Sequence, residues 1–227
     1  MVRLSENDSN PRVKDASERY MRLCNQNPKA EKYRQLIAPY FSDYGDKLAE
    51  LERMQKEVNF AQDAVWLFDG ILDNVLRNLN GRAREYDRDN PGSNTAIMLF
   101  PGGNITSIIT MPDKDEPDAA HSIAQKIIAL GDKHELYGYA AKIEDAVAKC
   151  RTALSQQVTA VQNLGNAKTA LSISKIALVR QYNACYFVAA SDVDKLFAEN
   201  LFPKLRPAKK KNNGNGNNGE DEIINGA

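Results

Sequence analysis

Proline is absent from two long stretches of this 227-residue chain, residues 40–90 and 118–202. Its nine prolines gather instead at 11–39, 91–117 and 203–207. Because a proline inside an α-helix costs about 3 kcal/mol or more, long proline-free stretches bounded by prolines favour long helices. We therefore expect a mainly α fold, an elongated antiparallel helical bundle of three long helices with shorter N-terminal helices.

The first proline-free stretch carries apolar residues at alternating steps of three and four positions. This heptad spacing predicts one long helix over residues 46–88. Its members are Leu51, Met54, Val58, Ala61, Val65, Phe68, Leu72, Val75 and Leu79. A second apolar stripe widens this face, so we expect the helix to pack against at least two neighbours. The second stripe consists of Phe60, Ala64, Leu67 and Ile71.

The second proline-free stretch predicts helical segments over 117–163 and 166–202. Gly131 and Gly165 are the expected breaks, because each follows an apolar residue and precedes a new polar start. Residues 170–190 are apolar or small on nearly every side. A helix with that composition is usually buried among its neighbours, which places the last segment at the centre of the bundle.

Shorter helices are expected over residues 12–42, and together with the long helices they would form a single bundle domain, 1–203. The remaining residues, 204–227, differ in composition: a basic block comes first, then Asn-Gly repeats, then acidic residues. Because this segment lacks the apolar residues that would offset chain entropy, we expect a disordered tail.

Residues 94–112 do not have the pattern of a long helix. Two runs rich in β-branched and other apolar residues, 95–100 and 105–111, flank a Pro-Gly-Gly-Asn turn. Glycine supplies the positive φ that tight hairpin turns need, so this pattern predicts a β-hairpin at one end of the bundle. The topology would bring the end of the last helix, Leu201-Phe202, to the same pole.

Charge and cysteine content restrict the class of protein. Thirty basic residues balance thirty acidic ones, which removes the simplest case for a nucleic-acid partner. Three cysteines are too few for a disulfide scaffold. The first ten residues are polar and no run of about 18 apolar residues occurs, so we expect neither a secretory leader nor a transmembrane helix. These observations favour a cytoplasmic protein.

Candidate chemistry is sparse. The histidines are His121 and His134, and Asp118 shares a helical face with the first of them. A di-metal bundle site would need a second Glu-x-x-His unit, which the chain lacks. The cysteines have no histidine nearby in sequence to serve as a base, and Cys150 and Cys185 occupy apolar positions typical of buried structural thiols. We therefore predict no enzyme, cofactor, metal or small-molecule ligand.

The resulting hypothesis is a non-enzymatic scaffold, assembly or adaptor protein that binds a protein partner or itself. The hairpin edge and the tail would make the contacts at one pole of the bundle, since an unpaired strand edge can accept another strand. The candidate interaction residues are Phe100, Pro101, Gly102, Gly103, Asn104, Ile108, Phe202, Lys209, Lys210 and Lys211.

Two architectural resemblances accompany this hypothesis. An apolar hairpin between two long helices resembles the α-helical pore-forming toxins, which implies the alternative of a membrane-interacting protein with the hairpin as its tongue. The order helix, hairpin, helix is also similar to prefoldin, a holdase chaperone, although prefoldin chains are shorter and lack a third buried helix. Liposome leakage discriminates the membrane alternative from the scaffold.

Overall fold

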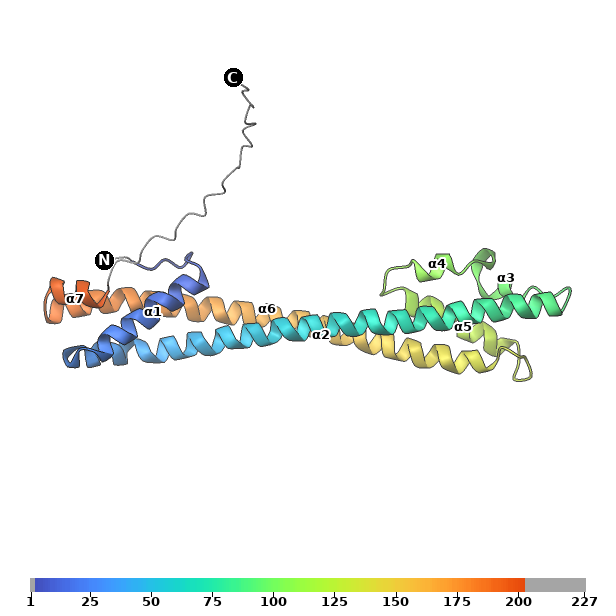
Figure 1. The fold of residues 1–227 in the computed structure, drawn as a ribbon, viewed down its shortest axis with the longest axis horizontal. Helices are drawn as coiled ribbons and strands as arrows, with labels where there is room; N and C mark the ends of the chain where they lie inside the picture. The colour runs from blue at the N-terminus through green and yellow to red at the C-terminus, as the bar shows by residue number, and fades with distance from the viewer. Residues whose placement is uncertain (1–2, 203–227) are drawn as a thin grey trace, which may run out of the picture. The chain divides into compact units, whose positions relative to one another are not determined.

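The computed structural model describes residues 3–202 and is mainly helical (Figure 1). It contains seven α-helices and two short 3-10 helices in this part of the chain, and no β-strand among these residues. The elements in order are α1 (Asn10–Asn25), η1 (Pro28–Ala30), α2 (Glu31–Asp89), α3 (Thr95–Leu99), η2 (Pro101–Gly103), α4 (Thr106–Ile109), α5 (Glu116–Ala129), α6 (Gly138–Asp192) and α7 (Lys195–Leu201).

The two long helices follow the proline-free stretches but extend further than predicted. Helix α2 begins at Glu31 and continues through Pro39, so the N-terminal segment predicted around residues 29–42 and the helix predicted over 46–88 form one element. Helix α6 likewise continues through Gly165, where a turn was expected. Gly165 does not have the positive φ of a helix-ending glycine. The expected break at Gly131 is confirmed, since its φ is +93° and it follows α5 directly.

The described chain divides into two compact units. One combines residues 3–37 with 179–202, and the other is Ala38–Leu178. In the first unit, Phe202 is buried and its ring lies 4.6 Å from that of Tyr20 and 4.9 Å from that of Tyr182, measured between ring centroids. These rings form an aromatic core in the first unit. Outside that core, Lys32 Nζ donates to Asp192 Oδ2 at 2.6 Å.

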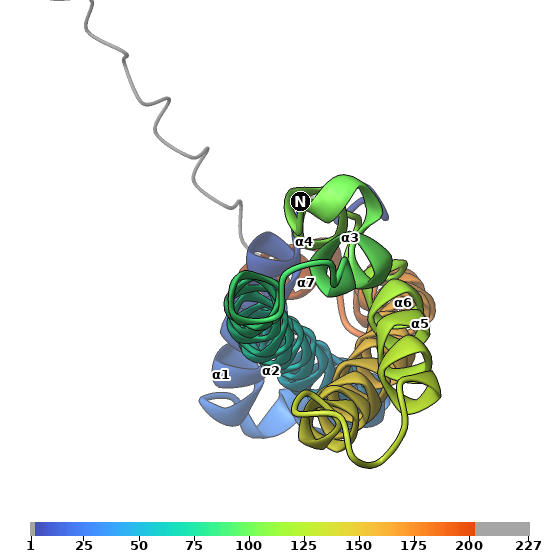
Figure 2. The same ribbon diagram turned by 90° about the vertical axis from the view of Figure 1, so that its right-hand side faces the viewer.

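In the second unit, α2 and α6 lie side by side and antiparallel (Figure 1). Hydrogen bonds fix their register, because Ser174 Oγ donates to Asp43 Oδ2 and Gln157 Nε2 donates to Gln62 Oε1. The end of α2 lies beside the start of α6. Helices α3, α4 and α5 pack together on this part of the α2–α6 pair (Figure 2). Most of the unit's buried apolar residues lie there.

The β-hairpin predicted over 94–112 is wrong. These residues form the short helices α3, η2 and α4 instead. The physical reason is the spacing of the apolar side chains: Ala96, Leu99 and Phe100 are buried at steps of three and four, while Ile97 and Met98 face solvent. A strand would alternate every second residue. The carboxylate of Asp87 holds the start of α3 by accepting from the backbone nitrogens of residues 95 and 96, at 2.8 and 2.9 Å.

Candidate functional site

Three of the residues predicted to make contacts have buried side chains. Phe100 and Ile108 are buried in the core of the second unit, and Phe202 is buried in the first. Phe100 and Phe202 thus belong to different cores. Burial leaves these three side chains little surface for a partner. Lys209, Lys210 and Lys211 lie outside the described residues.

The turn at residues 101–104 is exposed, apart from the half-buried Gly103, and bound to its own chain. Gly102 and Gly103 do adopt positive φ, +64° and +70°, as predicted for this turn. Arg84 Nη2 donates to the carbonyl of Gly103 at 2.9 Å, and Asn104 Oδ1 accepts from the backbone nitrogen of Thr106 at 3.0 Å. The turn presents no strand edge, because both flanking segments are helical. Residues 94–112 therefore do not form the β-hairpin on which the membrane alternative was based.

The most prominent exposed apolar feature is the second stripe of α2. Its side chains were predicted to pack against a further helix, yet Phe60 is 79% exposed, Leu67 60% and Ile71 38%. Trp66, which precedes Leu67 in sequence but points to a different side of α2, is 64% exposed. Scattered exposed apolar residues are ordinary, but a helical stripe of large ones marks an interaction surface more often than chance. We name Phe60, Ala64, Leu67 and Ile71 the α2 stripe.

The neighbouring part of α6 is notable for its lack of charge. Residues 152–167 contain no Asp, Glu, Lys or Arg. The hydroxyls of Thr152 and Thr159 donate to backbone carbonyls four residues earlier, at 2.8 and 3.0 Å, so these donors are satisfied inside the helix. Charge depletion with aromatic enrichment is typical of the core of protein interfaces. The lack of charged residues over 152–167 is a signal in the sequence from which this exposed part of α6 could have been predicted.

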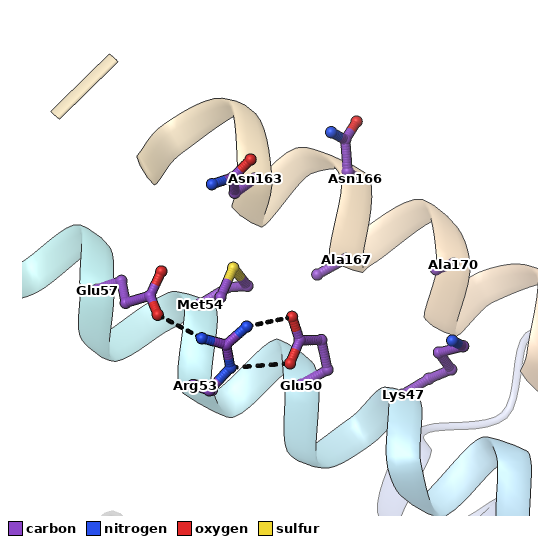
Figure 3. Close-up of a pocket in the computed structure, with 9 residues that line it drawn as sticks. All are labelled: Lys47, Glu50, Arg53, Met54, Glu57, Asn163, Asn166, Ala167 and Ala170. Carbon is purple, nitrogen blue, oxygen red and sulfur yellow. Dashed lines mark hydrogen bonds and ion pairs between the residues drawn. The ribbon is translucent and has the colours of Figure 1, made fainter. Parts of the chain in front are cut away.

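A groove of about 520 Å³ lies between α2 and α6 (Figure 3). Arg53 occupies its α2 side and binds two carboxylates, Glu50 at 2.7 Å and Glu57 at 2.7 Å. The hydrogen bonds from Arg53 lower the pKa of the Glu50 carboxyl. On the α6 side the lining residues are small or amide-bearing, among them Asn163 and Ala170. Lys47 also lines the groove, so the two basic and two acidic side chains of its lining balance. The lining therefore carries no net charge with which to select a small ion.

A buried carboxyl cluster joins α5 to α2. Glu116 is 2% exposed and lies in the first turn of α5, facing Asp69 and Asp73. Its Oε1 finds no donor among the described residues, so carboxyl–carboxyl bonds there require a shared proton. Burial, together with the neighbouring aspartates, raises the pKa of Glu116 to about 9. Arg77 Nη2 lies 3.2 Å from Asp73 Oδ2 and compensates part of the negative charge.

Burial raises the pKa of the Asp69 carboxyl as well. The thiol of Cys150 lies close enough to the carboxyls to be influenced by them, and burial raises its pKa to about 11. Such a thiol is a poor nucleophile at neutral pH.

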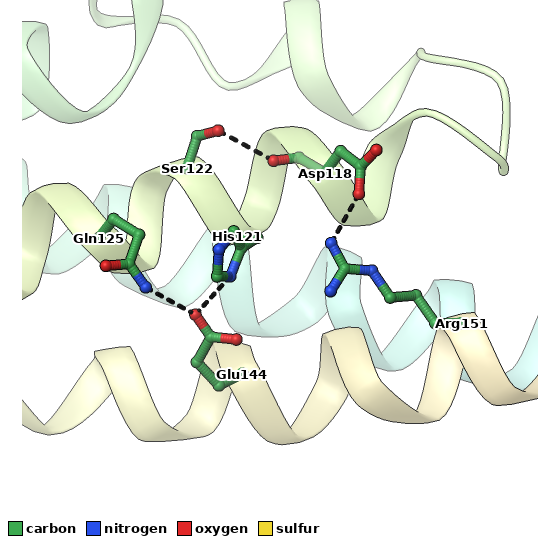
Figure 4. Close-up of polar contacts among 6 residues, drawn as sticks. All are labelled: Asp118, His121, Ser122, Gln125, Glu144 and Arg151. Carbon is green, nitrogen blue, oxygen red and sulfur yellow. Dashed lines mark hydrogen bonds and ion pairs between the residues drawn. The ribbon is translucent and has the colours of Figure 1, made fainter.

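A second polar network connects α5 to α6 (Figure 4). His121 Nδ1 lies 2.7 Å from Glu144 Oε1, and Arg151 Nη2 donates to Asp118 Oδ1 at 2.6 Å. Ser122 Oγ donates to the backbone carbonyl of Asp118 and not to the imidazole. Within residues 3–202, the histidine–carboxylate pair thus has no hydroxyl hydrogen-bonded to it, and the network is a partly exposed clamp between α5 and α6.

The described residues include no group of three or more His, Cys, Asp or Glu side chains arranged to hold a metal ion. Cys24, Cys150 and Cys185 are free and buried, which confirms the prediction of buried thiols for the latter two. Within residues 3–202, no helix combines the length and apolarity that crossing a membrane would require. A comparison of the chain with protein-family models, curated proteins and solved structures finds no match.

Proposed function

We propose that this chain is a non-enzymatic helical scaffold or assembly protein whose working surface is the α2 stripe and the adjacent uncharged part of α6. The observation that carries the proposal is the exposure of Phe60, Leu67 and Ile71 at helical spacing on one face of α2. Leaving such side chains in water forfeits about 1.5–3 kcal/mol for each one that a partner could bury completely.

The polar sites do not favour an enzyme as strongly. Arg53 in the groove is paired with two acids, Glu116 of the carboxyl cluster is buried, and the hydroxyl of Ser122 is bonded to its own helix. Each of these arrangements stabilises helix packing. A protein partner that presents an amphipathic helix would bury the α2 stripe in the way that helix-in-groove recognition usually does.

The experiment is site-specific photocrosslinking in the cells that produce the protein. A photoreactive residue replaces Leu67 in one variant and Leu196 in the control, because Leu196 is 69% exposed and lies on α7, away from the stripe in sequence. We expect a discrete covalent protein adduct at position 67 and none at 196, with the adduct identified by mass spectrometry. The proposal fails if position 67 gives no protein adduct, or if both positions give the same diffuse set.

A further inference from the structure

The α2 stripe and the groove lie on the same side of the α2–α6 pair. Counting from the groove residues Arg53 and Glu57, the stripe follows at steps of three and four, which keeps all of these residues on one helical face. Asn163, Asn166 and Ala170 line the groove from α6, and they too are three and four positions apart. Figure 3 shows the two helices facing each other across this groove.

The same side of α6 continues as a ridge of small, uncharged residues. Counting back from Asn163 by steps of three and four reaches Thr159 and Thr152, both exposed. The bond between Gln62 and Gln157 sets the register of the antiparallel pair, so Phe60 lies level with the region of Thr159 and Leu67 with the region of Thr152. One face of the pair therefore presents a bulky ridge on α2 next to a small ridge on α6.

Such a face is complementary to itself in one particular arrangement. A two-fold axis parallel to the helices places α2 of one copy against α6 of the other, antiparallel, twice in the same contact. Each bulky ridge then meets a small ridge, as ridges-into-grooves packing requires. A pairing of α2 with α2 would instead bring two bulky ridges together.

Charge favours the same pairing. Residues 57–76 of α2 contain four acidic residues and no basic one; Asp69 and Asp73 face α5, which leaves Glu57 and Asp63 outside that contact. Residues 146–178 of α6 contain four basic residues and no acidic one, and among them Arg151 pairs with Asp118 of α5. Contact between two α2 helices would concentrate like charges, and contact between α2 and α6 does not. Charge complementarity of this kind sets the orientation of partners more than it sets affinity.

We propose that the partner of this surface is a second copy of the chain, and that the two α2–α6 pairs form an antiparallel four-helix bundle with α2 of each copy packed on α6 of the other. This inference rests on the proposed function, since it names the occupant of the same surface. Coiled-coil-like bundles of four helices bury two apolar stripes on each helix, which gives the α2 stripe the neighbour that its width predicts.

The test uses the full-length chain in sedimentation equilibrium and light scattering. Wild-type protein should be a dimer at about 0.1 mM, within reach of even weak specific association. A double variant with Phe60→Glu and Leu67→Glu places charge on the bulky ridge, and a second with Thr152→Lys and Thr159→Lys places charge on the small ridge. Each alone should be a monomer, with dimerisation weakened roughly 30-fold or more. The matched control, Leu196→Glu, should dimerise like wild type.

Mixing the two double variants decides which helices meet. In the proposed arrangement the mixed dimer keeps one wild-type contact and pairs Glu with Lys in the other, so equimolar mixing should restore a dimer. Failure of mixing to restore it overturns the α2–α6 pairing. If wild-type protein is a monomer at 0.1 mM, the proposal that a second copy is the partner is overturned. The crosslinking experiment at position 67 would then still report independently whether a different protein binds there. Circular dichroism of each variant excludes unfolding as the cause of a monomer.

Discussion

Two stretches of α2 differ in how much of their surface the rest of the chain covers. Around Leu72, Leu76 and Leu79, helices α3, α4, α5 and α6 contribute to one large apolar core, and these leucines are fully buried. Around Met54, the buried apolar cluster contains only Leu164 and Ala167 of α6 besides Met54 itself, within the described residues. The heptad spacing is the same in both stretches, so the pattern alone does not decide how many neighbours a helix finds.

The difference shows that an apolar stripe indicates a surface that gains stability when it is buried. It does not indicate whether the same chain or another molecule covers that surface. In the well-covered stretch the same chain supplies the covering helices. In the other stretch the second stripe, Phe60 to Ile71, stays exposed. Substitution of a side chain that the chain itself buries should lower the free energy of unfolding, whereas substitution in the exposed α2 stripe should mainly affect binding of a partner.

The largest expected effect separates the two cores directly. Leu76→Ala should lower the free energy of unfolding by about 3–4 kcal/mol, because it leaves a cavity in a core that cannot collapse around it. Met54→Ala should cost about 1–2 kcal/mol, since its small cluster lies near solvent and relaxes more easily. Urea denaturation followed by circular dichroism measures both. Equal losses would show that the two stretches are packed alike and would break the comparison.

The next largest effect is the pH dependence of stability that arises from the buried Glu116. The direction of this dependence follows from the raised pKa of the Glu116 carboxyl. The carboxyl has a pKa of about 9 in the folded protein, against an ordinary value of 4.5. Folding therefore takes up a proton between these values, and this contribution to stability is complete below pH 4.5 and is lost as the pH rises through 9. Stability should fall with increasing pH across this window.

Glu116→Gln keeps the shape of the protonated side chain and removes its titration. The variant should be more stable than wild type at pH 8 by about 2 kcal/mol, because its folding no longer requires the uptake of a proton at a pH well above 4.5. Its stability should also depend less on pH. The exposed Glu52→Gln is the matched control and should leave the pH profile unchanged. A wild-type profile that rises from pH 5 to 9 would contradict the shared-proton arrangement.

Much of the helical architecture could be predicted from the sequence, because proline positions and heptad spacing act locally. Gly165 shows where that reasoning fails: a glycine after an apolar residue resembles a helix end, yet Leu164 and Ala167 keep the apolar spacing intact across it and both are buried. In residues 94–112 the β-branched composition pointed to strands, while the steps of three and four between buried residues carried the correct signal for helical turns.

The candidate site was harder to predict for a different reason. The α2 stripe was recognised in the sequence, but its exposure depends on which helices the tertiary fold places beside it. The Glu116 cluster depends on the same kind of information, since Glu116 meets Asp69 and Asp73 through helix packing across many intervening residues. No local spacing encodes which carboxyls come together.

A pair of glycine substitutions sharpens the contrast between an expected and an observed helix break. Gly165→Ala should stabilise the protein by about 0.5–1 kcal/mol, because alanine favours a helix interior and, apart from the adjoining residues and nearby backbone of α6, no described atom lies within 4 Å of the added methyl. Gly131→Ala should destabilise it by about 1 kcal/mol or more, since φ is +93° there. Thermal unfolding of both variants measures the difference. Destabilisation by the first would mean that α6 is interrupted at Gly165.

The smallest effect is expected at the exposed clamp between α5 and α6. Arg151 and Asp118 are 2.6 Å apart, but their side chains are 49% and 78% exposed, so solvent screens the pair. Arg151→Ala should cost about 0.2–1 kcal/mol, and the coupling to Asp118→Ala in a double-mutant cycle should shrink further in 0.5 M salt. A coupling well above this range would mean that surface charge, and not the apolar core around Leu76, holds α5 against the long helices. In that case α5 would be held against α2 and α6 mainly by ion pairs such as those that Arg53 makes with Glu50 and Glu57 in the groove.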